Sequence, residues 1–219
     1  LADAVSLVKT LHNTDIDLDK IPLDDKKTFE MLARGETMGL FQLNGSGITH
    51  YLKELKATTI HDINAMVALY RPGPMQFIPL YIERKHNAKL IKYLDPALEP
   101  ILKQTYGVLV YQDDLLLIAI NISGYSWGEA DKFRKAVGKK IPAEMAKQKN
   151  HFITGAVEHS KWPLKKATEL WNQIEPFAAY GFNKAHSASY GRVAYQTAYM
   201  KANFPVEYMT AILTAESGD

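Results

Sequence analysis

The segment from residue 131 to residue 149 carries the side chains best suited to holding phosphate groups. Two acidic residues, Asp131 and Glu144, stand among seven basic ones. A guanidinium group offers a planar fork of donors, and an ammonium group offers a mobile point charge. Gly138 allows the backbone to turn, so the pattern predicts a basic elbow between two helices. The basic residues are Lys132, Arg134, Lys135, Lys139, Lys140, Lys147 and Lys149.

The same charges are also typical of a solvated helix surface. Lys135 follows Asp131 by four residues and could simply pair with it. Arg134 differs because it lies at the edge of the apolar helix face. Its head could therefore point into a cleft, which favours Arg134 as a phosphate ligand.

A second candidate site begins at Gly181, which marks a turn. Asn183 can cap the helix that follows, and the N–H groups at the start of that helix, beside Lys184, form a natural anion site. His186 and Tyr190 are four residues apart, so they share a helix face that could line a pocket for a sugar or a base. A capped helix with a packed His–Tyr pair is the alternative interpretation.

Arg71 begins a third candidate, the sequence Arg-Pro-Gly-Pro, whose prolines restrict the backbone. This rigid segment could hold Arg71 at a fixed angle, or it could be only a loop between two helices. A weaker signal is the polar rim around four glycines, which lacks the spacing of a phosphate loop. That rim consists of Arg34, Gln42, Asn44 and Ser46.

The acidic residues do not predict a catalytic metal centre. Nucleotidyl transfer with two metal ions needs carboxylates fixed on a rigid element. Asp15, Asp17 and Asp19 lie in a polar link, and Asp113 and Asp114 are neighbours that point about 100° apart on a helix. We therefore expect no catalytic residue and no metal ligand in this chain.

The composition sets broader limits on fold and setting. The chain has 219 residues, 47% of them apolar, a net charge of +2 and no cysteine. A real core is expected, while a disulfide scaffold and a thiolate zinc site are excluded; the lack of cysteine fits a reducing cytoplasm. No apolar run approaches the roughly 20 residues that span a bilayer, so no membrane partner is expected. The start at Leu1, without a leader, indicates a piece of a longer protein.

Helical spacing runs through most of the chain and predicts a mainly α fold with roughly a dozen helices. Asp24 is expected to cap one helix, and Ser126 with Glu129 matches a capping box for another. Pro142 suits the first position of the next helix. Residues 106–111 are β-branched and aromatic, and they allow at most one short β hairpin.

Taken together and in order, several segments resemble bacterial DNA polymerase III alpha subunits, which are C-family replicative polymerases. The resemblance covers the chain from about Ile21 to Thr214. The segments that carry it are Leu40–Leu43, Tyr70–Pro74, Arg84–His86, Tyr106–Gln112, Ser123–Ser126, Gly128–Asp131, Gly138–Lys140, Glu144–Ala146, Tyr180–His186 and Ala194–Tyr199.

The resemblance implies a multi-helix fingers domain that closes over the incoming dNTP and contacts primer-template DNA. Residues 1–20 would be a residual connection from the palm and residues 21–219 the fingers, with two helical subdomains over about 21–105 and 106–219. The palm aspartates that bind Mg²⁺ would precede this chain, so the chain alone should be inactive. The palm, the thumb, the sliding clamp and other replicase subunits would be its partners, in the cytoplasm.

The resemblance also assigns site residues. His186 would lie against the sugar and exclude a 2′-hydroxyl, with Tyr190 behind it. The family often has arginine where Lys135 stands; lysine keeps the charge but not the fork, which favours Arg134 as the main phosphate ligand. The implied nucleotide-binding residues are Arg134, Lys135, Lys139, Lys140, Asn183, Lys184, His186 and Tyr190. The implied DNA-binding residues are Arg71, Lys147 and Lys149.

Two other classes of protein stay open at this point. A non-enzymatic helical DNA-binding module would bind duplex by itself, with an affinity that falls steeply with salt. A helical domain that binds protein, with its lysines serving solubility, would have no affinity for DNA even at low salt.

Overall fold

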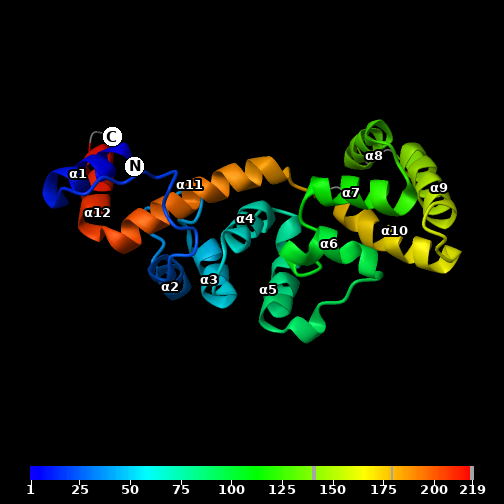
Figure 1. Ribbon diagram of the computed structural model, residues 1–219, viewed down its shortest axis with the longest axis horizontal. Helices are drawn as coiled ribbons and strands as arrows, with labels where there is room; N and C mark the ends of the chain where they lie inside the picture. Colours follow the sequence, from blue (N-terminus) through cyan, green and yellow to red (C-terminus); the bar gives the residue numbers. More distant parts are fainter. Residues whose placement is uncertain (140–141, 179, 218–219) are drawn as a thin grey trace. The chain divides into compact units, whose positions relative to one another are not determined.

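The computed structural model describes residues 1–139, 142–178 and 180–217, and its regular structure is almost entirely α-helical (Figure 1). Over these residues there is no β-strand, only an isolated parallel bridge between Tyr111 and Phe182. The mainly α fold predicted from the helical spacing is confirmed. None of the described helices is long and apolar enough to cross a membrane.

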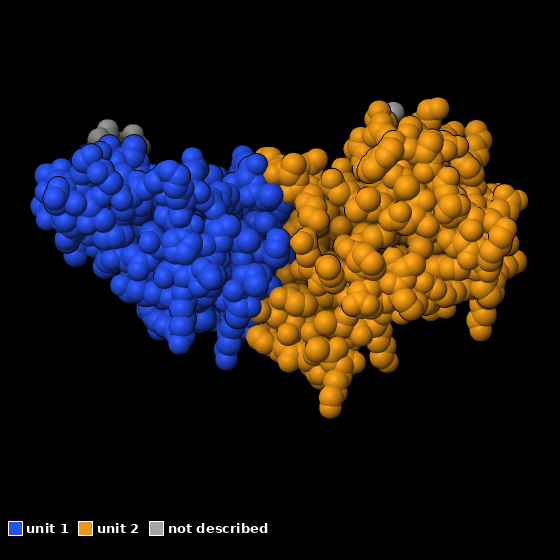
Figure 2. All heavy atoms as spheres, viewed as in Figure 1, with its two compact units in different colours: residues 1–67, 187–219 blue, residues 68–186 orange. Residues whose placement is uncertain are grey.

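The chain divides into two compact units (Figure 2). The first unit joins residues 1–67 to residues 187–219, and the second is the continuous segment 68–186. Two helices, α4 and α11, contribute residues to both units. The division expected near residue 105 falls inside the second unit, and the assignment of residues 1–20 to a palm connection stays a prediction.

The helices have the following bounds. The first unit contains α1 (Ala2–His12), α2 (Lys26–Arg34), α3 (Ser46–Leu55), most of α4 (Ile60–Leu69), most of α11 (Lys184–Asn203) and α12 (Pro205–Glu216). The second contains α5 (Ile78–His86), α6 (Glu99–Leu102), α7 (Gln112–Ser123), α8 (Trp127–Lys139), α9 (Pro142–Glu158) and α10 (Leu164–Ala178). It also contains the short 3₁₀ helices η1 (Pro74–Phe77), η2 (Ala88–Leu90), η3 (Pro96–Leu98) and η4 (Lys103–Thr105).

Capping side chains explain where several of these helices begin. The Ser126 N–H donates to Glu129 Oε2 over 2.8 Å, and the Glu129 N–H donates back to Ser126 Oγ, so the predicted capping box starts α8. Helix α9 begins at Pro142, as expected. The prediction of Asp24 as the cap of α2 was wrong by one residue, because Asp25 is the residue whose carboxylate accepts from the Thr28 N–H.

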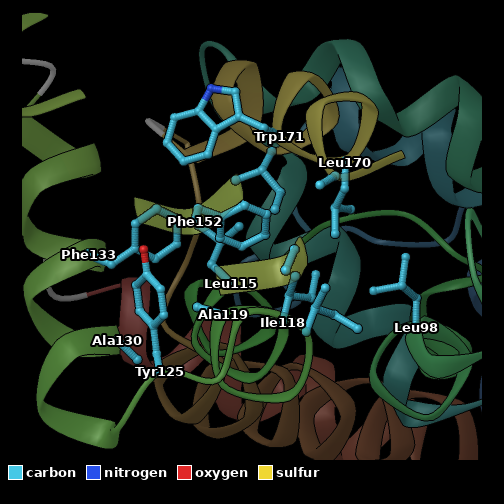
Figure 3. Packing of buried hydrophobic residues seen from close by; sticks show 14 of the residues in the cluster. Leu98, Leu115, Ile118, Ala119, Tyr125, Ala130, Phe133, Phe152, Leu170 and Trp171 are labelled. Carbon is cyan, nitrogen blue, oxygen red and sulfur yellow. The ribbon is translucent and has the colours of Figure 1, made fainter. Parts of the chain in front are cut away.

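An aromatic cluster holds α8, α9 and α10 together in the second unit (Figure 3). Phe133, Phe152 and Trp171 are fully buried, one from each helix, and their ring centroids lie 5.7–6.0 Å apart. Removing a phenylalanine from such a core costs about 3–5 kcal/mol. Because Phe133 fixes the rotation of α8, the next residue, Arg134, is held at the edge of the buried face.

Helix α11 organises the first unit through side chains that bind distant backbone. The Tyr195 hydroxyl donates to the Pro22 carbonyl over 2.7 Å and accepts from the Asp25 N–H over 3.1 Å. Arg192 Nη2 donates to the Asp19 carbonyl over 2.7 Å. The backbone of the polar, Asp-rich link before α2 is therefore held by side chains of α11, which lies near the other end of the sequence.

Candidate nucleotide site

Arg134 on α8 is held by two acceptors within the second unit. Its Nε and Nη2 donate to Asp131 Oδ1 over 3.2 and 2.7 Å, and its Nη1 donates to Gln112 Oε1 over 3.4 Å. Its side chain is 32% exposed. The guanidinium is therefore oriented by its neighbours and remains partly exposed, and the expectation that it points into a cleft stays a prediction.

Asp131 serves two cations at once. Its Oδ2 lies 2.6 Å from Lys135 Nζ, while its Oδ1 accepts from Arg134. Hydrogen bonds from Lys135, and then from Arg134, hold the pKa of the Asp131 carboxyl below its usual value. The pairing of Lys135 with Asp131, one of the two interpretations open from the sequence, is confirmed. Two cations share one carboxylate, so the cluster keeps a net positive charge.

The remaining residues of the basic elbow contribute less to the described geometry. Lys140 lies outside the described residues, and Lys139 is the last residue of α8. Lys147 on α9 is exposed and lies 3.3 Å from Glu144, and Lys149 is half-buried on the same helix. The roles expected for these four lysines stay predictions.

The turn before α11 docks on the start of α7. The Gln112 N–H donates to the Phe182 carbonyl over 2.9 Å, and the Phe182 N–H donates to the Val110 carbonyl over 3.3 Å. A side chain at Gly181 would bring its Cβ to 2.9 Å from Gln112 Cγ, so glycine is needed for this close approach. Two segments about 70 residues apart in sequence are thus fastened together.

The first N–H groups of α11 are already occupied by carboxylate and amide oxygens. The Lys184 N–H donates to Asp113 Oδ2 over 3.0 Å, and the His186 N–H donates to Asn183 Oδ1 over 2.8 Å. The predicted capping role of Asn183 is confirmed. The expectation of free N–H groups at this helix start was wrong for these two donors, because Asp113 reaches across from α7 as a built-in anion.

The side chain of Lys184 extends along the same junction. Its Nζ donates to Gln104 Oε1 over 3.3 Å and lies 5.5 Å from the centre of the Tyr111 ring. Lys184 as a whole is half-buried. Lys184 contacts Asp113, and Arg134 contacts Gln112. Because Gln112 and Asp113 are neighbours in the first turn of α7, Lys184 and Arg134 meet at the same junction.

Arg71 supports the turn from its other side. Its Nε donates to the Ala68 carbonyl over 3.0 Å and its Nη2 to the Tyr180 carbonyl, while its guanidinium carbon lies 4.6 Å from the centre of the Phe182 ring. Burial lowers the pKa of the Arg71 guanidinium from its ordinary value. The rigidity predicted for the segment after Arg71 agrees with this bracing geometry, and a DNA contact by Arg71 stays a prediction.

His186 and Tyr190 have different surroundings although one helical turn separates them. His186 is exposed and its ring centroid lies 5.3 Å from that of Phe182 in the second unit. Tyr190 belongs to the first unit, where its ring lies 5.4 Å from that of Phe41. The packed His–Tyr pair, one of the two sequence interpretations, stays a prediction.

Asp114 is a buried acid that the sequence did not single out. It is 1% exposed, and its Oδ2 accepts from the N–H groups of Tyr111 and Val110 over 3.0 and 3.4 Å. Burial raises the pKa of the Asp114 carboxyl to about 6, although these two hydrogen bonds act in the opposite direction. Asp114 thus fixes the backbone that pairs with Phe182.

Sequence reasoning also missed Gln104, Gln112 and Asp113 as parts of the site. Each contacts a residue far away in sequence, so no local spacing could reveal it. Among the described residues, no group of three or more histidine or acidic side chains could hold a metal ion.

This chain is similar in sequence to bacterial DNA polymerase III alpha subunits. Residues 1–160 match the family described as the bacterial DNA polymerase III alpha subunit finger domain. The DNA polymerase III subunit alpha of Thermus aquaticus is 47% identical, over 100% of this chain and 18% of its own length. The same subunit of Aquifex aeolicus is 46% identical, over 97% of this chain and 18% of that protein.

The DNA polymerase III subunit alpha of Deinococcus radiodurans is 46% identical, over 93% of this chain and 16% of its own length. This chain therefore spans less than a fifth of the length of these relatives. It belongs to the finger-domain family of bacterial DNA polymerase III alpha subunits.

Proposed function

We propose that this chain is the part of a bacterial replicative DNA polymerase that closes over the incoming dNTP and contacts primer-template DNA during template-directed synthesis. The similarity to DNA polymerase III alpha subunits supports this role. The palm and thumb, the sliding clamp and the other replicase subunits would meet the polymerase through regions outside this chain. The cytoplasm is the compartment that such a role requires.

The observation that carries the proposal is the convergence of two cationic elements on the first turn of α7. Arg134 from α8 contacts Gln112, and the start of α11 at Lys184 contacts Asp113. A dNTP brings a polyphosphate with several negative charges, and preorganised cations that face those charges stabilise phosphoryl transfer. Arg134 is oriented and accessible at once, which suits a phosphate ligand.

The geometry favours side chains over backbone as the phosphate ligands. The N–H groups of Lys184 and His186 already have acceptors, and an additional anion there would face the carboxylate of Asp113. We therefore assign the phosphates to the Arg134 guanidinium, with Lys135, Lys139 and Lys140 adding positive charge around it and the Lys184 ammonium on the other side. His186 would lie against the sugar.

Mg²⁺ would be held outside this chain. Its ligands are typically carboxylates together with substrate phosphates, and among the described residues no three histidine or acidic side chains are grouped so that they could hold a metal ion. The acidic residues of the site do not fit that role either, since Asp131 pairs with two cations and Asp113 accepts from backbone. The chain's own contribution is to bind and orient the nucleotide.

Duplex phosphates are assigned to the lysines of α9. Lys147 is exposed, and Lys149 lies two residues further along the same helix. Their contribution would be electrostatic and independent of base sequence. Arg71 is engaged with Tyr180 and Phe182, so its support of the turn before α11 is the better-founded part of its role.

Replacing Arg134 with alanine in the full-length polymerase tests the nucleotide site. A hydrogen-bonded charge pair is worth about 1.5–3 kcal/mol, so the apparent KM for dNTP should rise, or kcat fall, by roughly 10-fold to 100-fold. Steady-state primer extension with Mg²⁺ measures both parameters. Lys165→Ala, on the exposed surface of α10, is the control for loss of a positive charge. Unchanged KM and kcat in Arg134→Ala would refute the assignment.

The same experiment separates a polymerase from a module that only binds DNA. A binding module would retain duplex affinity with a steep dependence on salt, while the full-length protein would not extend a primer. Extension by the full-length protein, with loss of nucleotide affinity in Arg134→Ala, supports the polymerase role.

A further inference from the structure

We propose that Gln112 is a positioning residue for the nucleotide: it holds the Arg134 guanidinium against the turn that starts α11. This inference rests on the proposed function, because it concerns the same site. The residue is uncharged and does not itself neutralise a phosphate, so it acts through Arg134. Three independent contacts of Gln112 support the role.

The first contact is made by the side chain. Gln112 Oε1 accepts from Arg134 Nη1 over 3.4 Å, whereas Asp131 accepts from Nε and Nη2 of the same guanidinium. The planar group is thus held at both ends of its fork. If Asp131 were the only partner, the guanidinium could rotate about the bonds of the Arg134 side chain. Its Nη1 would then have no fixed direction.

The second contact is made by the backbone. The Gln112 N–H donates to the Phe182 carbonyl over 2.9 Å. The residue that holds Arg134 is therefore itself fixed to the turn that leads into α11. Asp113, the next residue, accepts from the Lys184 N–H over 3.0 Å and strengthens the same attachment.

The third contact is steric. The Gln112 side chain lies so close to Gly181 that a Cβ there would be 2.9 Å from Gln112 Cγ. Close packing on this side limits the rotamers of Gln112 and so aims its amide. The amide can hold Arg134 without neutralising it, which an acidic residue at the same position could not do.

The consequence is a coupling between α8 and α11. Because Gln112 at the start of α7 is bonded to both the turn and Arg134, a shift of the turn at Phe182 changes the direction of the Arg134 guanidinium. Misplacement of a ligand by about 1 Å can cost on the order of 100-fold in rate. Gln112 would thus set the position of the phosphate ligand relative to the helix that carries Lys184 and His186.

Gln112→Met in the full-length polymerase is the direct test. Methionine keeps the Cγ that packs on Gly181 and the backbone N–H that binds Phe182, and it replaces the side-chain amide that accepts from Arg134. We expect the dNTP KM to rise roughly threefold to tenfold, with an unchanged melting temperature. Gln173→Met, the same exchange at an exposed position of α10, is the matched control and should leave both values unchanged.

A double-mutant cycle shows whether Gln112 acts through Arg134. If it does, Gln112→Met should change the same kinetic parameter as Arg134→Ala and have no further effect in that background. Independent, multiplying effects would overturn the proposal. So would an unchanged KM in Gln112→Met when Arg134→Ala raises it. An unchanged KM in Arg134→Ala would instead overturn the proposed nucleotide site, and this inference with it.

Gln112→Glu is the second variant, and it remains informative if Gln112→Met unfolds. Glutamate keeps the length and the acceptor, but it adds a negative charge beside Arg134. We expect a larger increase in dNTP KM than with methionine, and we expect that increase to vanish in the Arg134→Ala background. A dNTP KM equal to that of the wild type would contradict the positioning role.

Discussion

Asp114 gives a quantitative prediction about how stability depends on pH. Its carboxyl is 1% exposed, and its pKa in the folded chain is about 6, compared with an ordinary value of 3.8. Between these two values the folded chain keeps a proton that the unfolded chain releases. The free energy of unfolding therefore falls as the pH rises across this window, and it stays lower above it.

The magnitude follows from the size of the shift. A difference of about two pKa units corresponds to about 3 kcal/mol, which is the amount by which the charged carboxylate destabilises the fold above about pH 6. Asparagine has nearly the same shape, and its oxygen can accept from the N–H groups of Tyr111 and Val110. Asp114→Asn should therefore stabilise the chain by up to about 3 kcal/mol at about pH 8, and by little at about pH 4.

Urea unfolding of the wild type and of Asp114→Asn, repeated from about pH 4 to about pH 8, measures this difference. Other titrating groups cancel because only the difference between the two proteins is followed. Asp3→Asn, on the exposed side of α1, controls for the loss of a negative charge. A difference between wild type and Asp114→Asn that does not vary with pH would refute the reasoning.

Three further predictions concern the site and the helix that follows it. His186→Ala should raise ribonucleotide incorporation by the full-length polymerase roughly tenfold, and an unchanged deoxy-to-ribo ratio would remove the sugar role. Gly191→Ala should lower the melting temperature, because the added Cβ would lie 2.9 Å from Asn64 Cγ. Such a clash costs about 1–3 kcal/mol. An unchanged melting temperature would show that α4 can shift to accommodate the methyl group. Arg71→Lys keeps the charge but loses the fork, so amide exchange at Tyr180 and Phe182 should accelerate by roughly tenfold or more, and slow exchange there would show that other contacts hold the turn.

The start of each helix could be predicted wherever a local signal exists. Ser126 and Glu129 form the expected capping box, and Pro142 begins α9, because capping depends on residues within one turn of each other. Asp24 and Asp25 are both good caps, and the choice between them was wrong because Asp25 alone reaches Thr28. Helix existence was thus easier to predict than helix boundaries.

The candidate site was only partly accessible from sequence. Arg134 could be singled out because its position on an amphipathic helix is a local property. The attachment of α11 to α7 could not, since it depends on two backbone hydrogen bonds at Phe182 and on the reach of Asp113, which leave no periodic pattern. The expectation of a free N–H group at Lys184 was wrong for the same reason, because its acceptor, Asp113, comes from a distant helix.

The two-part composition of the first unit has a consequence for how the protein is made. Residues 1–67 leave the ribosome before residues 68–186, but the helix that binds their backbone, through Arg192 and Tyr195, follows only after them. At about 5–20 residues per second, the delay is on the order of ten seconds. The second unit is continuous and can fold during that time, while the segment 1–67 keeps apolar surface exposed. Chaperones would therefore meet this segment, rather than the aromatic cluster, during translation.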